Sequence, residues 1–144
     1  MIVPLSQLLQ YQNSDVINRY KKEYPDNTLG PEEAFTELLK FLWLCNKHKY
    51  DQMTNPEQEE LNFQCVIHHE MKEIDDMWHT FLLFTKGYMD FCNFYFKKYI
   101  HHTPFSNEIA PSQEQLTTHL TYYLSYIYDH LGEKTLIRWF GIRD

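Results

Sequence analysis

The sequence predicts an all-α protein, a single compact domain over residues 1–144 with six or seven helices. Apolar residues recur at helical spacing along most of the chain and alternate almost nowhere, a pattern typical of helices rather than strands. The chain has 144 residues, 43% of them hydrophobic and 17% aromatic, so it can bury one core and is not expected to be disordered. Its four glycines and six prolines are too few for a turn-rich β sandwich.

The first three helices are expected in the N-terminal third of the chain. A short helix is expected over residues 5–9, where Leu5, Leu8 and Leu9 have helical spacing. Pro4 is compatible with this helix, because proline is accepted in a first turn. A second helix begins at Ser14, whose hydroxyl can cap it, and stops before Pro25. The third and longest helix begins at Pro31 and carries an apolar stripe wide enough for a central core helix.

Two further helices are expected in the middle of the chain. A polar break at residues 51–56 ends the long helix, and the apolar spacing becomes helical again from Glu70. Thr85 can cap the next helix, which ends near Ile100. If the two helices are joined about residues 85–87, they form a central antiparallel hairpin.

The last two helices have clear boundary signals. Ser112 and Gln115 have the spacing of a capping box, which opens a helix. Gly132 stands where a helix C-terminus favours glycine, and a short helix over residues 133–140 follows.

The negative charge is concentrated in one stretch. The chain carries 13 Lys and Arg against 20 Asp and Glu, a net charge of −7, which disfavours binding to nucleic acid. Residues 51–76 hold eight acids and one Lys, so the whole net charge lies there. The stretch is either a solvated face or a docking surface for a basic protein partner. The residues expected to contact such a partner are Glu57, Glu59, Glu60, Glu70, Glu73 and Asp76, with Trp139 as an aromatic anchor.

Cysteine usage and hydropathy indicate a cytoplasmic protein. The three cysteines are odd in number and have no C-x-x-C spacing, so we expect buried free thiols in a reducing compartment. No apolar run approaches the roughly 18 residues of a membrane span. The N-terminus lacks the basic and apolar regions of a signal peptide.

Histidines gather in the middle of the chain. Residues 65–104 hold five of the eight. One interpretation is a zinc-type metal site, since zinc prefers four N, S or O ligands. The candidate ligands are Asp75, His79, Cys92, His101 and His102.

The other interpretation is structural: Asp75 accepts a hydrogen bond from His79, one helical turn away, and fixes its tautomer. The chain has no H-E-x-x-H motif. Cys92 lies in an aromatic run that offers a nucleophile neither exposure nor positive charge. No catalytic residue is therefore assigned.

A family resemblance covers roughly residues 70–104. The chain reads Ile-Asp-Asp-Met-Trp-His-Thr-Phe-Leu-Leu-Phe-Thr over residues 74–85. Together with the residues that follow, this resembles the signature D-x-x-W-H … Y-x-x-F-C … F-I-H-H-x-P. That signature is typical of small bacterial proteins related to the N-terminal region of the glycine-rich domain proteins. The matching positions are Asp75, Trp78, His79, Cys92, His101, His102 and Pro104. The resemblance implies an all-helical fold and transfers no enzymatic role. Relatives usually have a glycine where this chain has Lys97, so we expect a different local turn there.

Two hypotheses about function follow. The first is a non-catalytic protein–protein interaction module without a cofactor, present as a monomer or a homodimer. Such a module binds a partner protein, and if the partner is an enzyme it inhibits that enzyme. A fainter similarity in size and composition is to small helical antagonists that bacterial pathogens encode beside ubiquitin deamidases or transglutaminases. The second hypothesis is a zinc-binding protein, structural or hydrolytic, that uses the His79/His101/His102 cluster. Neither nucleic acid nor a membrane is an expected partner.

Overall fold

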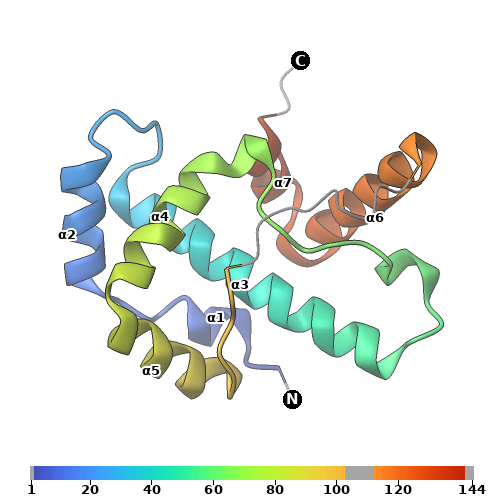
Figure 1. Ribbon diagram of the computed structural model, residues 1–144, viewed down its shortest axis with the longest axis horizontal. Helices are drawn as coiled ribbons and strands as arrows, with labels where there is room; N and C mark the ends of the chain where they lie inside the picture. Colours follow the sequence, from blue (N-terminus) through green and yellow to red (C-terminus); the bar gives the residue numbers. More distant parts are fainter. Residues whose placement is uncertain (1, 103–111, 142–144) are drawn as a thin grey trace.

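Helix α3 (Pro31–Thr54) is the central element of the fold, and the other helices pack around it (Figure 1). The computed structural model describes residues 2–102 and 112–141, and within these ranges every regular element is helical, so the prediction of an all-α fold is confirmed. The other elements are α1 (Leu5–Leu8), α2 (Ser14–Glu23), the 3₁₀ turns η1 (Glu59–Leu61) and η2 (His69–Met71), α4 (Lys72–Leu83), α5 (Thr85–Phe96), α6 (Gln113–Leu131) and α7 (Glu133–Phe140).

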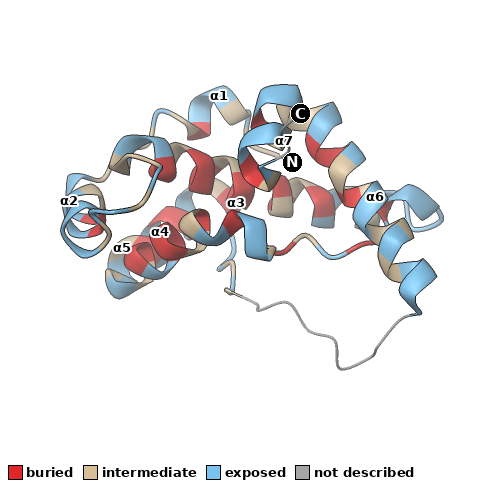
Figure 2. Ribbon diagram, turned by 90° about the horizontal axis from the view of Figure 1, so that it is seen from above, coloured by how far each residue is buried: buried red, intermediate tan, exposed pale blue. Residues whose placement is uncertain are grey.

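The core lies where α3 crosses α4. Leu38, Phe41 and Leu42 of α3 are fully buried, and so are Met77 and Phe81 of α4. Buried residues follow α3 and α4 through the middle of the molecule, whereas the first turns of α6 are exposed (Figure 2). Helix α4 is thus held rigidly against the central helix, which matters because it carries two of the site residues described below.

Several boundaries differ from those predicted. Asn13, not Ser14, caps α2, since its Oδ1 accepts a hydrogen bond from the Val16 amide at 3.2 Å. Helix α3 continues to Thr54 through most of the predicted polar break. Phe84 alone separates α4 from α5, so Thr85 is the first helical residue of α5 and not its cap.

The predicted signals at the C-terminal helices are confirmed. The Ser112 hydroxyl accepts from the Gln115 amide and the Gln115 side chain accepts from the Ser112 amide, which completes the capping box of α6. Gly132 has φ +91°, a conformation that favours glycine, and this lets α7 begin directly after α6 ends. No helix within the described residues is long and apolar enough to cross a membrane.

Helix α7 places Trp139 in the core, which corrects its prediction as an exposed anchor. Trp139 is 1% exposed, and its indole N–H donates to Oε1 of Glu37 on α3 at 2.8 Å. Glu37 is equally buried and also accepts from Lys40 and Arg138, both at 3.2 Å. Trp139 therefore joins α7 to α3 and cannot reach a partner protein while the helix is docked.

Candidate metal centre

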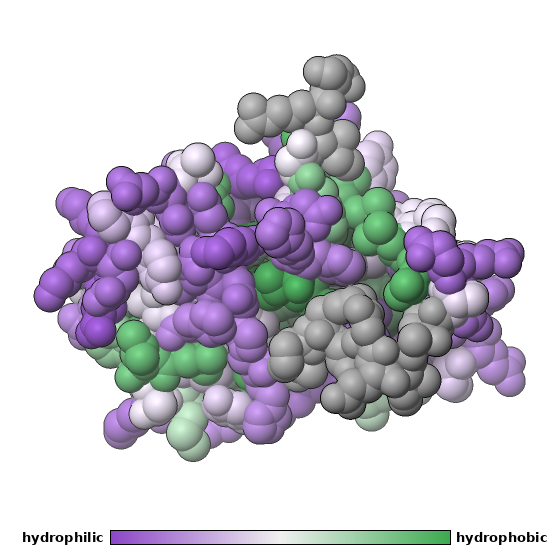
Figure 3. Space-filling model, turned by 45° about the horizontal axis from the view of Figure 1, so that its top comes forward, coloured by the Kyte–Doolittle hydropathy of each residue, from purple (hydrophilic) through white to green (hydrophobic). Residues whose placement is uncertain are grey.

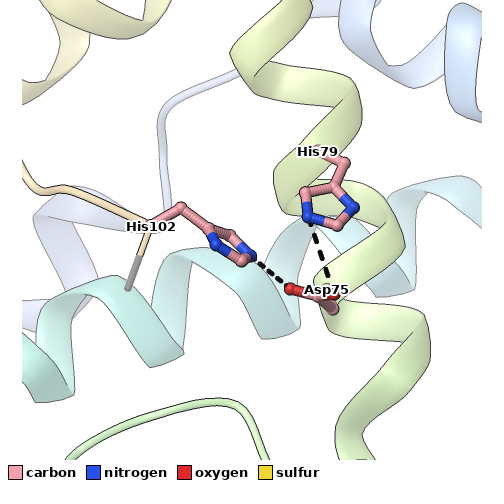
Figure 4. Close-up of side chains that lie close together, drawn as sticks. All are labelled: Asp75, His79 and His102. Carbon is pink, nitrogen blue, oxygen red and sulfur yellow. Dashed lines mark hydrogen bonds and ion pairs between the residues drawn. The ribbon is translucent and has the colours of Figure 1, made fainter. Parts of the chain in front are cut away.

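Asp75, His79 and His102 converge at one point on the surface of α4 (Figure 4). Asp75 and His79 are one helical turn apart on α4, and His102 follows α5 in the sequence. The Asp75 carboxylate contacts both imidazoles: Oδ1 lies 2.5 Å from Nε2 of His102, and Oδ2 lies 3.7 Å from Nε2 of His79. The two imidazole rings lie with their centroids 4.6 Å apart.

His102 reaches Asp75 because the chain turns back after α5. Lys97 ends α5 in the left-handed conformation with φ +60°, where a glycine is usually favoured. This is the position where the family resemblance led us to expect a different local turn, and Lys97 adopts the backbone conformation that a glycine would adopt. The segment that follows returns along α4 towards its first turns.

A buried tyrosine secures that segment. The Tyr88 hydroxyl donates to the Ile100 carbonyl at 2.6 Å and accepts from the Trp78 indole N–H at 3.0 Å. Burial raises the pKa of Tyr88, so the hydroxyl keeps its proton and remains a donor. Because Ile100 is only two residues from His102, this network fixes the backbone close to His102.

The site is closed on one side and open on the other. The ring of His102 packs on Trp78, with centroids 4.5 Å apart, and its side chain is 20% exposed. The Asp75 side chain is 25% exposed and that of His79 is 53% exposed. Solvent therefore reaches the cluster from the His79 side, whereas Trp78 shields it from behind.

The three side chains have the chemistry of a zinc-type site. One oxygen of Asp75 and one ring nitrogen of each histidine all lie within 4.8 Å of one another, and zinc binds such atoms at about 2.0–2.2 Å. Three protein ligands leave one position open for water or for an atom of another molecule.

His101 and Cys92 do not join this cluster, which corrects their prediction as ligands. His101 follows α5 in an irregular segment and is exposed, and it is not among the three residues whose ligand atoms converge. The His101 ring instead packs on Tyr99, with centroids 4.7 Å apart. Cys92 is fully buried on the core side of α5, and burial raises the pKa of its thiol. Pro104, the last position of the family signature, lies outside the described residues.

The predicted docking residues fall into two groups. Glu57, Glu59, Glu60 and Glu70 are exposed, so their contact with a basic partner stays a prediction. Glu73 and Asp76 instead bind groups of this chain. Glu73 accepts from the Leu29 amide at 2.8 Å, and Asp76 accepts from Asn27 at 3.1 Å and pairs with Lys72 at 3.3 Å. The face in Figure 3 is largely hydrophilic, with apolar side chains in separate patches.

Sequence spacing pairs Asp75 with His79, because residues four apart on a helix share a face. It gives no reason to choose His102 over His101 as the partner of Asp75, and it does not reveal the role of Tyr88. Tyr88 has the same helical spacing as the core aromatics of α5, so nothing in the sequence marks its hydroxyl as a bridge. All three cysteines are free, as predicted, but of the three only Cys92 is buried, since Cys45 and Cys65 lie half-buried beside one another.

Comparisons with known proteins place the chain in a family. No curated protein and no solved structure matches it. The resemblance to the glycine-rich domain family and the fainter similarity to antagonists of ubiquitin-modifying enzymes therefore stay predictions. A family model described as UCP032817-like matches residues 7–139. Since this match covers nearly the whole chain, the protein belongs to the UCP032817-like family.

Proposed function

We propose that this protein binds a zinc-type divalent metal ion through Asp75, His79 and His102. The observation that carries the proposal is the convergence of one carboxylate and two imidazoles, all with ligand atoms within 4.8 Å, at a solvent-accessible point. The ligands come from a helix and from a segment far along the chain, so metal binding would tie the segment after α5 to α4. Three protein ligands with an open fourth position are the arrangement of catalytic zinc sites, whereas structural zinc sites use four protein ligands.

The arrangement of the ligands supports this role. Both histidines direct Nε2 towards the Asp75 carboxylate. A cation bound among the three side chains would therefore replace the direct contacts of the histidines with Asp75, and the three side chains would keep their mutual arrangement. For the metal-bound state, the proton of each ring would lie on Nδ1, because Nε2 must offer its lone pair. Trp78 packs against the ring of His102 from the core side, and the Tyr88 hydroxyl holds the Trp78 indole and the Ile100 carbonyl.

The test is the metal-to-protein ratio, by elemental analysis, of untagged protein purified without chelator, followed by zinc titration of the metal-free protein. We expect a ratio near one. His102→Gln and His79→Gln should weaken zinc binding by more than about 100-fold, beyond the effect of losing an outer-shell partner. His101→Gln is the matched control, since it removes the adjacent imidazole that lies outside the cluster, and it should bind zinc normally.

The structural interpretation makes a different prediction for the same variants. If Asp75 and His102 form only an internal hydrogen bond, His102→Gln lowers the melting temperature equally with and without zinc. A metal ratio near zero, together with a melting temperature that added zinc does not change, would refute the metal-binding proposal.

Protein–protein interaction is a second candidate, favoured by the exposure of Glu57, Glu59 and Glu60 beside the exposed Met53 at the end of α3. Charged rim residues of this kind speed association with a basic partner. The test is affinity capture from the native lysate with the wild-type protein and with the three glutamates changed to lysine. Proteins retained by both baits alike would exclude this loop as the contact, and a captured enzyme can be assayed directly for inhibition.

A further inference from the structure

A second cluster of reactive side chains lies away from the Asp75 site. The Sγ atoms of Cys45 on α3 and Cys65 in the segment between η1 and η2 are 3.0 Å apart, although the residues are 20 positions apart in sequence. Both cysteines are free and half-buried. A disulfide has an S–S distance of about 2.05 Å, so the two sulfurs need to approach by about 1 Å to bond.

The backbone around the pair is held in place. The Cys45 thiol also donates to the Cys65 carbonyl at 3.3 Å. The Tyr123 hydroxyl of α6 donates to the carbonyl of the next residue, Val66, at 2.9 Å. The fold therefore holds these thiols together, and forming the bond requires side-chain rotation rather than rearrangement of helices.

The thiols line a pocket of about 390 Å³. Its wall includes two lysines, Lys49 and Lys98, and His101, whereas none of the described residues that line it is Asp or Glu. Burial and the nearby charge of Lys49 lower the pKa of Lys98, as expected for a partly desolvated cation beside a second one. In a protein with a net charge of −7, this is a local site suited to an anion.

We propose that Cys45 and Cys65 form a thiol–disulfide exchange site whose co-reactant is an anionic low-molecular-weight disulfide bound in this pocket. The thiolate of one cysteine attacks the bound disulfide, which forms a mixed disulfide and releases one thiolate. The second cysteine thiolate then attacks the protein sulfur of the mixed disulfide. The Cys45–Cys65 bond forms, the second small thiolate leaves, and the two small thiolates take up the two protons that the cysteines lost.

The roles of the two cysteines differ. Burial, and then the neighbouring Cys65 thiol, raise the pKa of Cys45, so Cys45 is poorly suited to make the first attack. Cys65 lies in an irregular segment, whereas Cys45 is fixed on the central helix. We therefore assign the first attack to Cys65 and the resolving step to Cys45. This site does not depend on the metal-binding proposal, since the pocket lining does not include Asp75, His79 or His102.

The experiment treats the reduced full-length protein with oxidised glutathione, which is anionic, and counts free thiols after denaturation. We expect the count to fall from three to one, with peptide mapping showing a Cys45–Cys65 link and a free Cys92. Cys45→Ser should retain one glutathione as a mixed disulfide, because the resolving thiol is missing. Cys92→Ser is the matched control and should form the internal bond like the wild type.

The charge of the co-reactant is tested separately with a cationic disulfide, cystamine. Lys49→Gln combined with Lys98→Gln should slow the reaction with oxidised glutathione by about tenfold and should not slow the reaction with cystamine. Three free thiols after treatment of the wild type, or glutathione adducts without an internal bond, would overturn the exchange site. Equal rates for both probes in the double variant and the wild type would overturn the anionic co-reactant.

Discussion

At the scale of single residues, His48 shows how burial changes a side chain that the sequence leaves unmarked. It is 4% exposed, its ring stacks on Phe63 with centroids 4.0 Å apart, and its Nε2 lies 2.9 Å from the Leu61 carbonyl. A carbonyl only accepts, so Nε2 carries the proton of the neutral ring. Burial lowers the pKa of His48, although the Leu61 carbonyl and Asp51 act in the opposite direction.

We predict from this environment that His48 makes the protein less stable as the pH falls. The unfolded chain takes up the proton near pH 6.5, whereas the folded chain resists it to a lower pH, so stability is lost as the pH drops through that range. His48→Gln should reduce the pH dependence of the free energy of unfolding, by at most about 1.4 kcal/mol per pH unit. The measurement is urea denaturation between about pH 7 and pH 5.

His69→Gln, which removes an exposed imidazole, is the control for this experiment. If the wild type and His48→Gln lose stability in parallel over the whole range, His48 is not the buried neutral group that the structure describes.

At the scale of elements, the acidic side chains near the N-terminus of α4 bind groups of neighbouring segments. Asp75 contacts His102, and Asp76 binds Asn27 and Lys72. Glu73 accepts from both the amide and the hydroxyl of Thr28 at 3.0 Å and from the Leu29 amide at 2.8 Å. These carboxylates fix the turn before α3 and the segment after α5 to one helix.

We predict that Glu73→Ala lowers the free energy of unfolding by about 1–3 kcal/mol, because two backbone amides lose a charged acceptor. Glu70→Ala, at an exposed position three residues earlier, is the matched control and should change it by no more than about 0.5 kcal/mol. Chemical denaturation gives both values, and hydrogen exchange should be faster at the Thr28 and Leu29 amides in Glu73→Ala alone. Equal effects of the two substitutions would show that Glu73 is solvated rather than bound.

At the scale of the whole molecule, the contact of α7 with α3 joins distant parts of the chain. Glu37 and Trp139 are 102 positions apart, yet the indole N–H and the carboxylate meet in the core. The buried carboxylate is also paired with Lys40 and Arg138, which offsets the cost of removing it from water. The contact of α7 with α3 thus includes one buried aromatic side chain and one charged network, while α7 also packs on α6.

We predict that Trp139→Ala lowers the free energy of unfolding by about 3–5 kcal/mol, because it leaves a cavity and removes a donor from Glu37. Phe94→Ala is the matched control, since Phe94 is 64% exposed on α5, and its effect should stay within about 0.5 kcal/mol. Thermal and urea unfolding give the comparison. A small effect of Trp139→Ala, similar to that of the control, would mean that α7 does not dock in solution and that Trp139 is free to act as an anchor.

The sequence by itself determined the helical fold class and most helix positions. Those properties depend on neighbours within a few residues: the apolar period, the capping box at Ser112 and the glycine at position 132 all act locally. The pairing of Asp75 with His79 is local in the same way, because a separation of four residues places two side chains on one face of a helix.

Only the tertiary structure decided which of the marked residues meet. His102 but not His101 reaches Asp75, because the backbone direction after Lys97 selects one of two adjacent side chains. Trp139 lies in the core and the thiols of Cys45 and Cys65 lie in contact, because packing brings distant segments together. Contacts of this kind depend on how whole helices cross, and a local sequence pattern carries no information about that geometry.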